Sequence, residues 1–187
     1  MQEGSWWNNQ QPMCPPSVRY HFSLQNCGGS VIFCGMKVRN AKVADVDTIH
    51  ALITHYAQLD RMLFRSKAYI YDNLQMFSVA QIGKKVVGCC ALQVIWADLA
   101  EIKSLAVACR HRKKGIGKAL VKNAVKQAEA LGISKVFALT LEPEFFEKIG
   151  FSIVGKKTLP MKVWSDCAKC SKQENCDEIA VELIVSS

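Results

Sequence analysis

The sequence contains no long apolar run, and its cysteines are not spaced like a disulfide scaffold. The longest hydrophobic stretches fall well short of the roughly 20 residues that a membrane-spanning helix needs, and the N-terminus lacks the basic-then-apolar order of a secretory signal. The nine cysteines are an odd number and lie among apolar neighbours, as in "VVGCCALQVIW", which favours a reducing compartment. We therefore expect a cytoplasmic protein without a membrane partner.

Charge and regular periodicity are both scarce in the first 35 residues. Only Glu3 and Arg19 are charged there, and Gln, Asn, Pro and Gly occur in clusters. The adjacent Trp6 and Trp7 fit an unstructured tail better than a docking element. We expect an irregular extension over residues 1–35 and one folded domain over residues 36–187, with no internal repeats.

Positive charge is abundant in the chain as a whole. The 24 Lys and Arg against 16 Asp and Glu leave a formal charge of +8, which suits an anionic partner such as nucleic acid, an acidic membrane surface or a polyphosphate. Half of the 187 residues are hydrophobic, enough for one substantial core.

From Met36 onward the periodicity predicts a mixed α/β fold, a central sheet with flanking helices. Strands are expected over residues 36–41, 76–82, 85–96, 99–108, 135–141, 151–156 and 178–185, the second and third forming an antiparallel hairpin at Gly83 and Lys84. Helices are expected over residues 44–59, 66–74 and 143–149, and a long one begins after Gly115. Its buried face should comprise Ile116, Leu120, Val121, Ala124, Val125, Ala128 and Leu131.

The start of that long helix is unusually basic. Five cations, Arg110, Arg112, Lys113, Lys114 and Lys118, surround Gly115 and Gly117, although the helix dipole disfavours cations at this end. Backbone N–H groups at a helix start bind phosphate, and glycines let the backbone approach closely. The loop is therefore expected to bind a polyphosphate. It is neither a P-loop nor a dinucleotide fingerprint, because it lacks the Gly-Lys-Ser/Thr end of the first and the three glycines of the second.

Two stretches of this sequence resemble the GNAT N-acetyltransferase superfamily. "RKKGIG", Arg112 to Gly117, follows "EIKSLAV" and looks like the superfamily's Arg/Gln-x-x-Gly-x-Gly/Ala motif, and "PEFFEKIGF" looks like its later helix and strand. The resemblance implies an N-acetyltransferase domain over residues 36–187, an acetyl-CoA-binding β-α unit, and acetyl-CoA as co-substrate held by Arg112, Lys113, Lys114, Gly115, Ile116, Gly117 and Lys118.

The chain also resembles one subfamily, the short single-domain N-acetylglutamate synthases of arginine biosynthesis. The resemblance rests on "LFRS", "AEIKSLAV", "LTLEPEFFEKIGF" and the tail "LPMKVWSDCAKCSKQENCDEIAV". It implies acetyl transfer to the α-amine of glutamate, or of a close relative such as glutamine. Phe64 departs from the subfamily, where a proline is expected.

The strand before the basic loop carries the candidate catalytic residues. Strand alternation places Glu101, Lys103 and Leu105 on one face and Ile102, Ser104 and Ala106 on the other. We assign Glu101 as the general base, which the resemblance supports, and Lys103 as a contact for a substrate carboxylate. The alternative is an exposed cross-strand ion pair. Backbone N–H groups near Ala106 and Val107 are expected to contact the carbonyl oxygen of the acetyl group.

Arg65 in "LFRS" is the best further candidate for a substrate carboxylate, since a guanidinium binds one with two parallel hydrogen bonds. Arg61 is expected to be a solvated charge at a helix end. Many superfamily members have a tyrosine as general acid where this chain has Phe146, so we expect Phe145 and Phe146 to be packing residues. His50 and His55 fit ordinary helix positions, and His111 is a possible phosphate contact whose protonation its cationic neighbours disfavour.

Cys167, Cys170 and Cys176 form an incomplete metal-binding pattern. A closed zinc site needs four ligands, and no histidine lies near; Asp166 or Asp177 would have to complete it. A redox-active pair is a second alternative, and ordinary reduced thiols fit best. No metal is expected.

Three functions from different classes remain open. The first is acetyl transfer to glutamate or glutamine. The second keeps acetyl-CoA but takes a polyamine, an antibiotic or a protein lysine as acceptor, which acidic residues around the acceptor would favour. The third, a non-enzymatic module for nucleic acid, needs aromatics among the cations, and the basic loop has none. We therefore expect a small-molecule substrate, no nucleic-acid partner, and a homodimer by analogy with the superfamily.

Overall fold

A computed structural model describes residues 35–160 and 176–185. Its seven strands are β1 (Met36–Asn40), β2 (Phe77–Ile82), β3 (Lys85–Trp96), β4 (Leu99–Val107), β5 (Lys135–Thr140), β6 (Ser152–Val154) and β7 (Ile179–Ile184). Its α-helices are α1 (Val46–Ala57), α2 (Lys67–Asp72), α3 (Ile116–Ala130) and α4 (Pro143–Glu147). Four 3-10 turns connect them: Val43–Asp45, Leu74–Met76, Cys109–His111 and Lys156–Thr158. The predicted mixed α/β architecture is confirmed.

The strands form one sheet in the order β1-β2-β3-β4-β5-β7-β6. Neighbouring strands are antiparallel except β4 and β5, which run parallel because α3 crosses over between them. The predicted hairpin is confirmed: β2 and β3 pair from Ile82 and Lys85 outward, around Gly83 at a φ of +57°.

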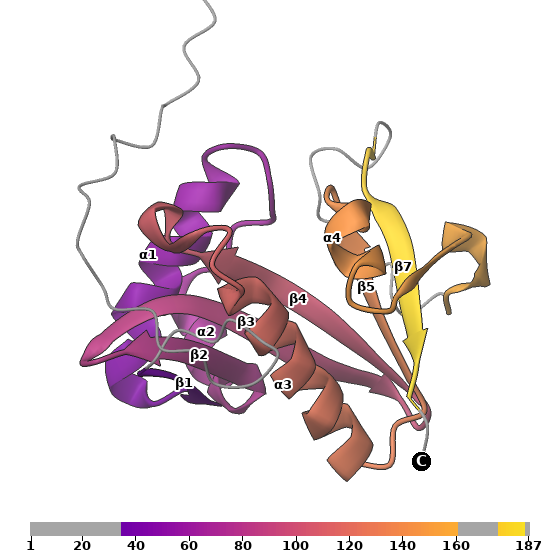
Figure 1. The fold of residues 1–187 in the computed structure, drawn as a ribbon, viewed down its shortest axis with the longest axis horizontal. Coiled ribbons are helices and arrows are strands. Elements are labelled where there is room, and N and C mark those ends of the chain that lie inside the picture. The colour runs from indigo at the N-terminus through magenta and orange to yellow at the C-terminus, as the bar shows by residue number, and fades with distance from the viewer. Residues whose placement is uncertain (1–34, 161–175, 186–187) are drawn as a thin grey trace, which may run out of the picture.

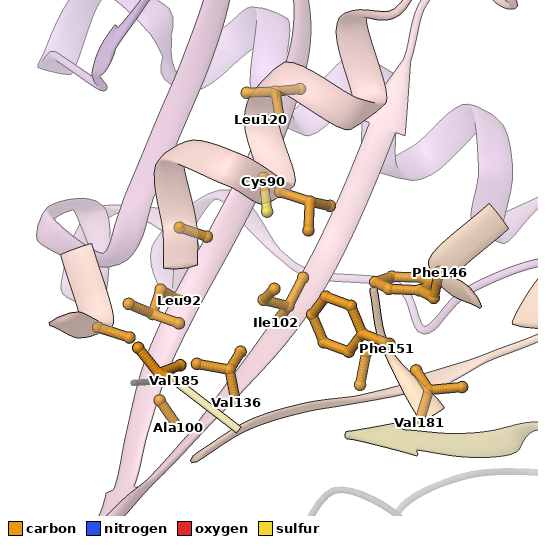
Figure 2. Packing of buried hydrophobic residues seen from close by; sticks show 14 of the residues in the cluster. Cys90, Leu92, Ala100, Ile102, Leu120, Val136, Phe146, Phe151, Val181 and Val185 are labelled. Atoms are coloured by element: carbon orange, nitrogen blue, oxygen red, sulfur yellow. The ribbon is translucent and has the colours of Figure 1, made fainter. Parts of the chain in front are cut away.

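Helices cover both faces of the sheet (Figure 1). On one face, α3 packs with Ile116, Leu120 and Ala124 against residues of the central strands. On the other face, α1 and α2 bury Ile49, Ile53 and Ile70 in a separate cluster. Figure 2 shows the first cluster, which contains Ile102 of β4 together with Phe146 and Phe151.

The apolar face of α3 differs from the prediction at its C-terminal end. Ile116, Leu120, Val121, Ala124 and Ala128 are buried, and Val125 packs partly against them. Leu131 is 63% exposed. It lies one residue beyond the helix, directly before Gly132 at a φ of +75°, where the chain turns away from the face that the helical period extrapolates.

An irregularity in β4 changes which side chains share a face. Ser104 has a left-handed φ of +52°, and the register with β3 shifts between Cys89 and Ala91, opposite Lys103 to Ala106. Such a bulge inserts a residue and breaks the alternation. Ile102 before it and Leu105 after it therefore contact the same cluster beneath α3. The prediction that Leu105 shares a face with Glu101 and Lys103 is wrong.

The parallel pairing of β4 and β5 is short. It spans only Leu99 to Glu101 opposite Lys135 to Phe137, after which the two strands part (Figure 1). The C-terminal half of β4 thus has β3 on one side and an open edge on the other, and this edge faces the candidate site.

Among the residues that the structure describes, no helix is both long and apolar enough to cross a bilayer. The division of the chain at residue 35 stays a prediction. Trp6, Trp7, Cys167 and Cys170 lie outside the described residues.

Candidate active site

A cleft of about 540 Å³ opens where β4 and β5 part. Its walls come from β4, the basic loop and start of α3, the segment after α1, and the end of β5 with α4. Glu101, Lys103, Arg65, Arg112, Gly115 and Gly117 all line it. The structure therefore brings the predicted phosphate loop, the predicted base and both predicted carboxylate contacts to one cavity.

The basic loop is shaped by two left-handed residues. Lys113 has a φ of +58° and Gly115 a φ of +77°, and Gly115 is the N-cap of the 15-residue α3. Left-handed turns at a helix start direct successive backbone N–H groups to one side, where the positive end of the dipole adds attraction for an anion. The fit to a pyrophosphate rests on this backbone and on the surrounding cations.

Gly117 lets the loop pack closely against α4. A Cβ atom at this position would lie 3.3 Å from Cζ of Phe145, closer than side chains normally pack. A close neighbour therefore favours the second glycine of the motif, whereas the first glycine is favoured by its own backbone conformation.

Glu101 and Lys103 form a mostly buried ion pair at the cleft wall. Lys103 Nζ lies 3.1 Å from Glu101 Oε2, with the two side chains 9% and 11% exposed, and donates to Gln93 Oε1 at 2.7 Å. The alternative of an exposed cross-strand pair is wrong on both counts, because the residues lie on one strand and are shielded from water. The partner Gln93, opposite Glu101 on β3, was not predicted.

The backbone of β4 distinguishes Val107 from Ala106. The Ala108 N–H donates to Val87 O at 2.8 Å, and Val107 and Ala106 lie opposite Gly88 and Cys89. Because paired and unpaired positions alternate in an antiparallel ladder, the backbone groups of Val107 point away from β3, whereas those of Ala106 point towards it. Val107 lines the cleft and Ala106 does not.

Tyr56 is a site residue that the sequence did not reveal. It lies on the buried face of α1, as its periodicity predicts, but its hydroxyl reaches the cleft and donates to Val107 O at 2.6 Å. Helical spacing indicates which side of a helix is buried, but it does not indicate where the hydroxyl at the end of a tyrosine side chain lies.

Arg65 is held at the cleft by its local sequence. Ser66 is the N-cap of α2 and accepts the Tyr69 N–H at 3.1 Å. This cap places Arg65 directly before the helix, where its guanidinium carbon lies 4.6 Å from the centre of the Tyr69 ring. Phe64, the departure from the subfamily pattern, is 56% exposed and packs edge-on against His50.

Arg61 is exposed, as predicted for a solvated charge, but its place at the cleft was not predicted. It lines the cleft and forms an ion pair with Glu142, which lies on the opposite side between β5 and α4. The two positions are 81 residues apart, so sequence spacing gives no sign of the contact.

His111 and Lys114 occupy different parts of the basic loop. His111 lines the cleft, and its pKa is lowered first by burial and then by Lys114, Arg110 and Lys85. The predicted effect of cationic neighbours is confirmed, with burial as the larger cause. Lys114 is exposed and, unlike the other residues predicted for the motif, does not line the cleft.

Phe146 is confirmed as a packing residue. It is 4% exposed and makes edge-to-face contacts with Phe145 and Phe151. Its ring belongs to the core beneath α3, and Phe145 packs partly against the same cluster while meeting Gly117.

The cysteines of the described ranges are free thiols, namely Cys89, Cys90, Cys109 and Cys176. Burial raises the pKa of Cys89 to about 12 and also raises that of Cys90, so neither is a nucleophile. Cys109 lies 3.3 Å from His55 Nε2 at the surface. Within residues 35–160 and 176–185 no three His, Cys, Asp or Glu side chains gather as a metal site would require, and the expectation for the segment that includes Cys167 and Cys170 stays a prediction.

Comparison with known proteins decides the family. The model of the acetyltransferase (GNAT) family matches residues 44–151, more than half of the chain. The protein belongs to this family. The GNAT fold and an acetyl-CoA-dependent N-acetyltransferase activity are thereby confirmed, and the non-enzymatic nucleic-acid module is set aside.

Two relatives of this GNAT protein match it over most of their own length. An uncharacterised N-acetyltransferase of Chlorobaculum tepidum is 42% identical over 144 residues, which is 77% of this chain and 93% of the relative. An amino-acid acetyltransferase of Mycobacterium tuberculosis is 35% identical over 139 residues, or 73% of this chain and 79% of the relative. The resemblance to amino-acid acetyltransferases is confirmed.

Solved structures agree with these relatives. A Mycobacterium tuberculosis protein in complex with CoA and NLQ has a TM-score of 0.71 at 30% identity, covering 80% of this chain and 99% of that one. An N-acetylglutamate synthase of Neisseria gonorrhoeae, complexed with coenzyme A and N-acetyl-glutamate, has a TM-score of 0.75 at 27% identity. Here the match covers 81% of this chain and 35% of that longer chain.

Proposed function

We propose that this GNAT enzyme acetylates the α-amine of glutamate or glutamine, as an N-acetylglutamate synthase of arginine biosynthesis does. The observation that carries the proposal is one cleft that holds a shielded carboxylate, Glu101, together with two cations, Arg65 and Lys103. An acceptor with a carboxylate and an amine requires such a combination. The amino-acid acetyltransferases among the relatives support it.

In this proposal Glu101 prepares the acceptor for reaction. The transfer forms a bond between the amine nitrogen and the acetyl carbon and breaks the bond from that carbon to sulfur. The amine must lose a proton, which Glu101 accepts directly or through a water. The Val107 N–H, on the open edge of β4, is the candidate donor to the carbonyl oxygen as it gains charge. Phe146 has no proton to give, so the departing thiolate takes its proton from water.

The remaining assignments follow the same site. Arg65 binds one carboxylate of the acceptor and Lys103 contributes to the second, while Arg112, Lys113, Gly115, Ile116, Gly117 and Lys118 hold the pyrophosphate end of acetyl-CoA, with Lys114 at the rim. A cytoplasmic location, expected from the cysteine pattern, and a homodimer belong to the same proposal.

A cationic acceptor is the second candidate, and one observation favours it. Glu142, Glu144 and Glu178 also line the cleft, and carboxylates attract a polyamine or a lysine side chain. The ion pair between Glu142 and Arg61 neutralises one of them, which leaves glutamate as the better-supported acceptor.

The test is coenzyme A release from acetyl-CoA, followed with a thiol reagent, against glutamate, glutamine, aspartate, ornithine, lysine, spermidine and a basic peptide. Turnover with glutamate or glutamine and little with the cations is expected. Arg65→Ala should then raise the KM for the amino acid and leave the KM for acetyl-CoA unchanged. Turnover confined to cationic acceptors would contradict the assignment of Arg65 and Lys103.

A further inference from the structure

The ion pair between Arg61 and Glu142 joins the two sides of the cleft. Arg61 Nη2 contacts Glu142 Oε1; Arg61 lies between α1 and α2, and Glu142 lies between β5 and α4. Both residues line the cavity that also contains Arg65 and Lys103. A carboxylate of the protein itself therefore binds a guanidinium inside the proposed acceptor site.

Backbone hydrogen bonds fix the positions of Arg61 and Glu142 on the two sides of the cleft. The Arg61 N–H donates to Tyr56 O at 3.0 Å, directly after Asp60 in a left-handed conformation with a φ of +54°. The Glu142 N–H donates to Thr140 Oγ1 at 3.0 Å. Both residues are thus presented to the cleft by ordered turns, so their meeting is a property of the fold.

The pair is exposed enough to exchange partners. The side chains of Arg61 and Glu142 are 41% and 58% exposed, and ion pairs in contact with water contribute little to stability. Lys103, by contrast, is 9% exposed and already contacts Glu101 and Gln93. A second acceptor carboxylate therefore needs a further cation, and Arg61 lies in the same cleft with an exposed carboxylate as its present partner.

We propose that Arg61 determines specificity for dicarboxylate acceptors, and that Glu142 occupies the position of the acceptor's side-chain carboxylate until the acceptor displaces it. Glu142 is then an internal competitor of the substrate. This proposal rests on the proposed function, because it needs a dicarboxylate acceptor. It concerns binding and selectivity; neither residue takes part in the proton transfer.

The proposal predicts opposite effects for the two residues. Glu142→Gln should lower the KM for glutamate several-fold, because the competitor loses its charge. Arg61→Gln should raise the KM for glutamate about tenfold or more and change the KM for glutamine much less, because the amide side chain carries no charge. In the double variant, Glu142→Gln should no longer lower the KM for glutamate. The KM for acetyl-CoA should be unchanged throughout.

Glu144→Gln is the matched control. It removes one negative charge from the same cleft, on the first turn of α4, while leaving the Arg61–Glu142 pair intact, and it should change the KM for glutamate less than Glu142→Gln does. Thermal unfolding of each variant confirms that it is folded, and calorimetric titration with glutamate repeats the comparison without turnover.

Four results would overturn the proposal. A raised KM for glutamate in Glu142→Gln would show that the pair is a structural brace. Equal effects of Glu142→Gln and Glu144→Gln would show a general effect of charge. With turnover of glutamate established, an unchanged KM in Arg61→Gln would contradict this proposal alone, whereas wild-type turnover of cationic acceptors only would contradict the proposed function as well.

Discussion

Glu101 combines two properties that favour a general base in this enzyme. Its side chain is shielded from bulk water, and it lines the cleft that we propose as the acceptor site. Lys103 beside it compensates the cost of burying the carboxylate. The carboxylate of Glu101 therefore carries both the ion pair with Lys103 and the proposed role of base.

Glu101→Gln should lower kcat by roughly 100-fold or more, the usual range for loss of general acid–base catalysis. The KM for acetyl-CoA should be unchanged, because the phosphate loop lies at the other end of β4. Steady-state kinetics with both substrates measure this. Glu129→Gln, on the exposed side of α3, is the control for loss of one carboxylate, and an unchanged kcat in Glu101→Gln would remove this residue from the base role.

Sequence reasoning was most accurate for residues whose role follows from local pattern. The glycines of the loop, Phe146 in the core and Arg65 before a capped helix are all placed as their neighbours in the chain suggested. Contacts between distant segments were missed. Arg61 with Glu142, and Tyr56 with Val107, depend on the tertiary fold, and no spacing rule indicates them.

At the scale of elements, the loop between β1 and α1 depends on one carboxylate. Asp45 accepts hydrogen bonds from Arg39 at 2.7 and 2.9 Å and from the Lys42 N–H at 2.8 Å. These hydrogen bonds lower the pKa of Asp45, and the bond from Arg39 has the largest effect. The carboxylate therefore stabilises the fold fully above its unfolded pKa, roughly 3.9, and loses this contribution as the pH falls through its lower folded pKa.

Asp45→Asn should reduce the free energy of unfolding at pH 7 by roughly 1–3 kcal/mol, as expected for hydrogen bonds to a charged group. Urea denaturation at pH 7 and again near pH 3 tests this, and the difference from wild type should shrink at the lower pH. Asp47→Asn is the control, since Asp47 pairs with Lys67 at 2.7 Å but is 78% exposed. Equal losses in the two variants would contradict the role given to Asp45.

The contact between the basic loop and α4 gives a second element-scale prediction. Gly117→Ala should raise the KM for acetyl-CoA several-fold, because the new Cβ must displace Phe145 and with it the loop backbone. Stability should change little, since alanine also improves helix propensity. Gly155→Ala is the control, because its Cβ would lie 3.9 Å from the nearest atom. An unaltered KM in Gly117→Ala would show that the packing tolerates the methyl group.

The prediction of elements succeeded where a pattern continued and failed where it was interrupted. The strands, the helices and the hairpin follow from hydrophobic period and turn residues. The exposed position of Leu131 and the bulge at Ser104 do not, because each depends on a backbone angle that leaves the regular period.

At the scale of the whole molecule, the formal charge of +8 is relevant to substrate binding because part of it lies at the cleft. Cations gather where β4 ends and α3 begins, and Arg112, Lys113 and Lys118 line the cleft. We expect these charges to attract the pyrophosphate of acetyl-CoA over a distance that falls as the salt concentration rises.

Raising sodium chloride from about 0.05 M to about 0.5 M should increase the KM for acetyl-CoA several-fold, because screening shortens the reach of these charges. Initial rates at fixed acceptor concentration measure the effect. Arg112→Gln should show a weaker salt dependence, whereas Lys122→Gln, on an exposed position of α3, should behave as wild type. The same salt dependence in all three proteins would contradict a local role of the loop.

The bulge at Ser104 also affects how sequence variation in this protein should be analysed. In a saturation mutagenesis scan along β4, tolerance to substitution should alternate from residue to residue. The alternation up to Lys103 and the alternation from Leu105 onward should be out of phase by one residue. Library designs that assume uninterrupted alternation would assign Leu105 to the same face as Glu101 and Lys103, although it packs against the cluster beneath α3. Insertion or deletion of one residue at 104 would exchange the two faces for the rest of the strand. The residue at 104 therefore determines which side of the sheet the following side chains of β4 face.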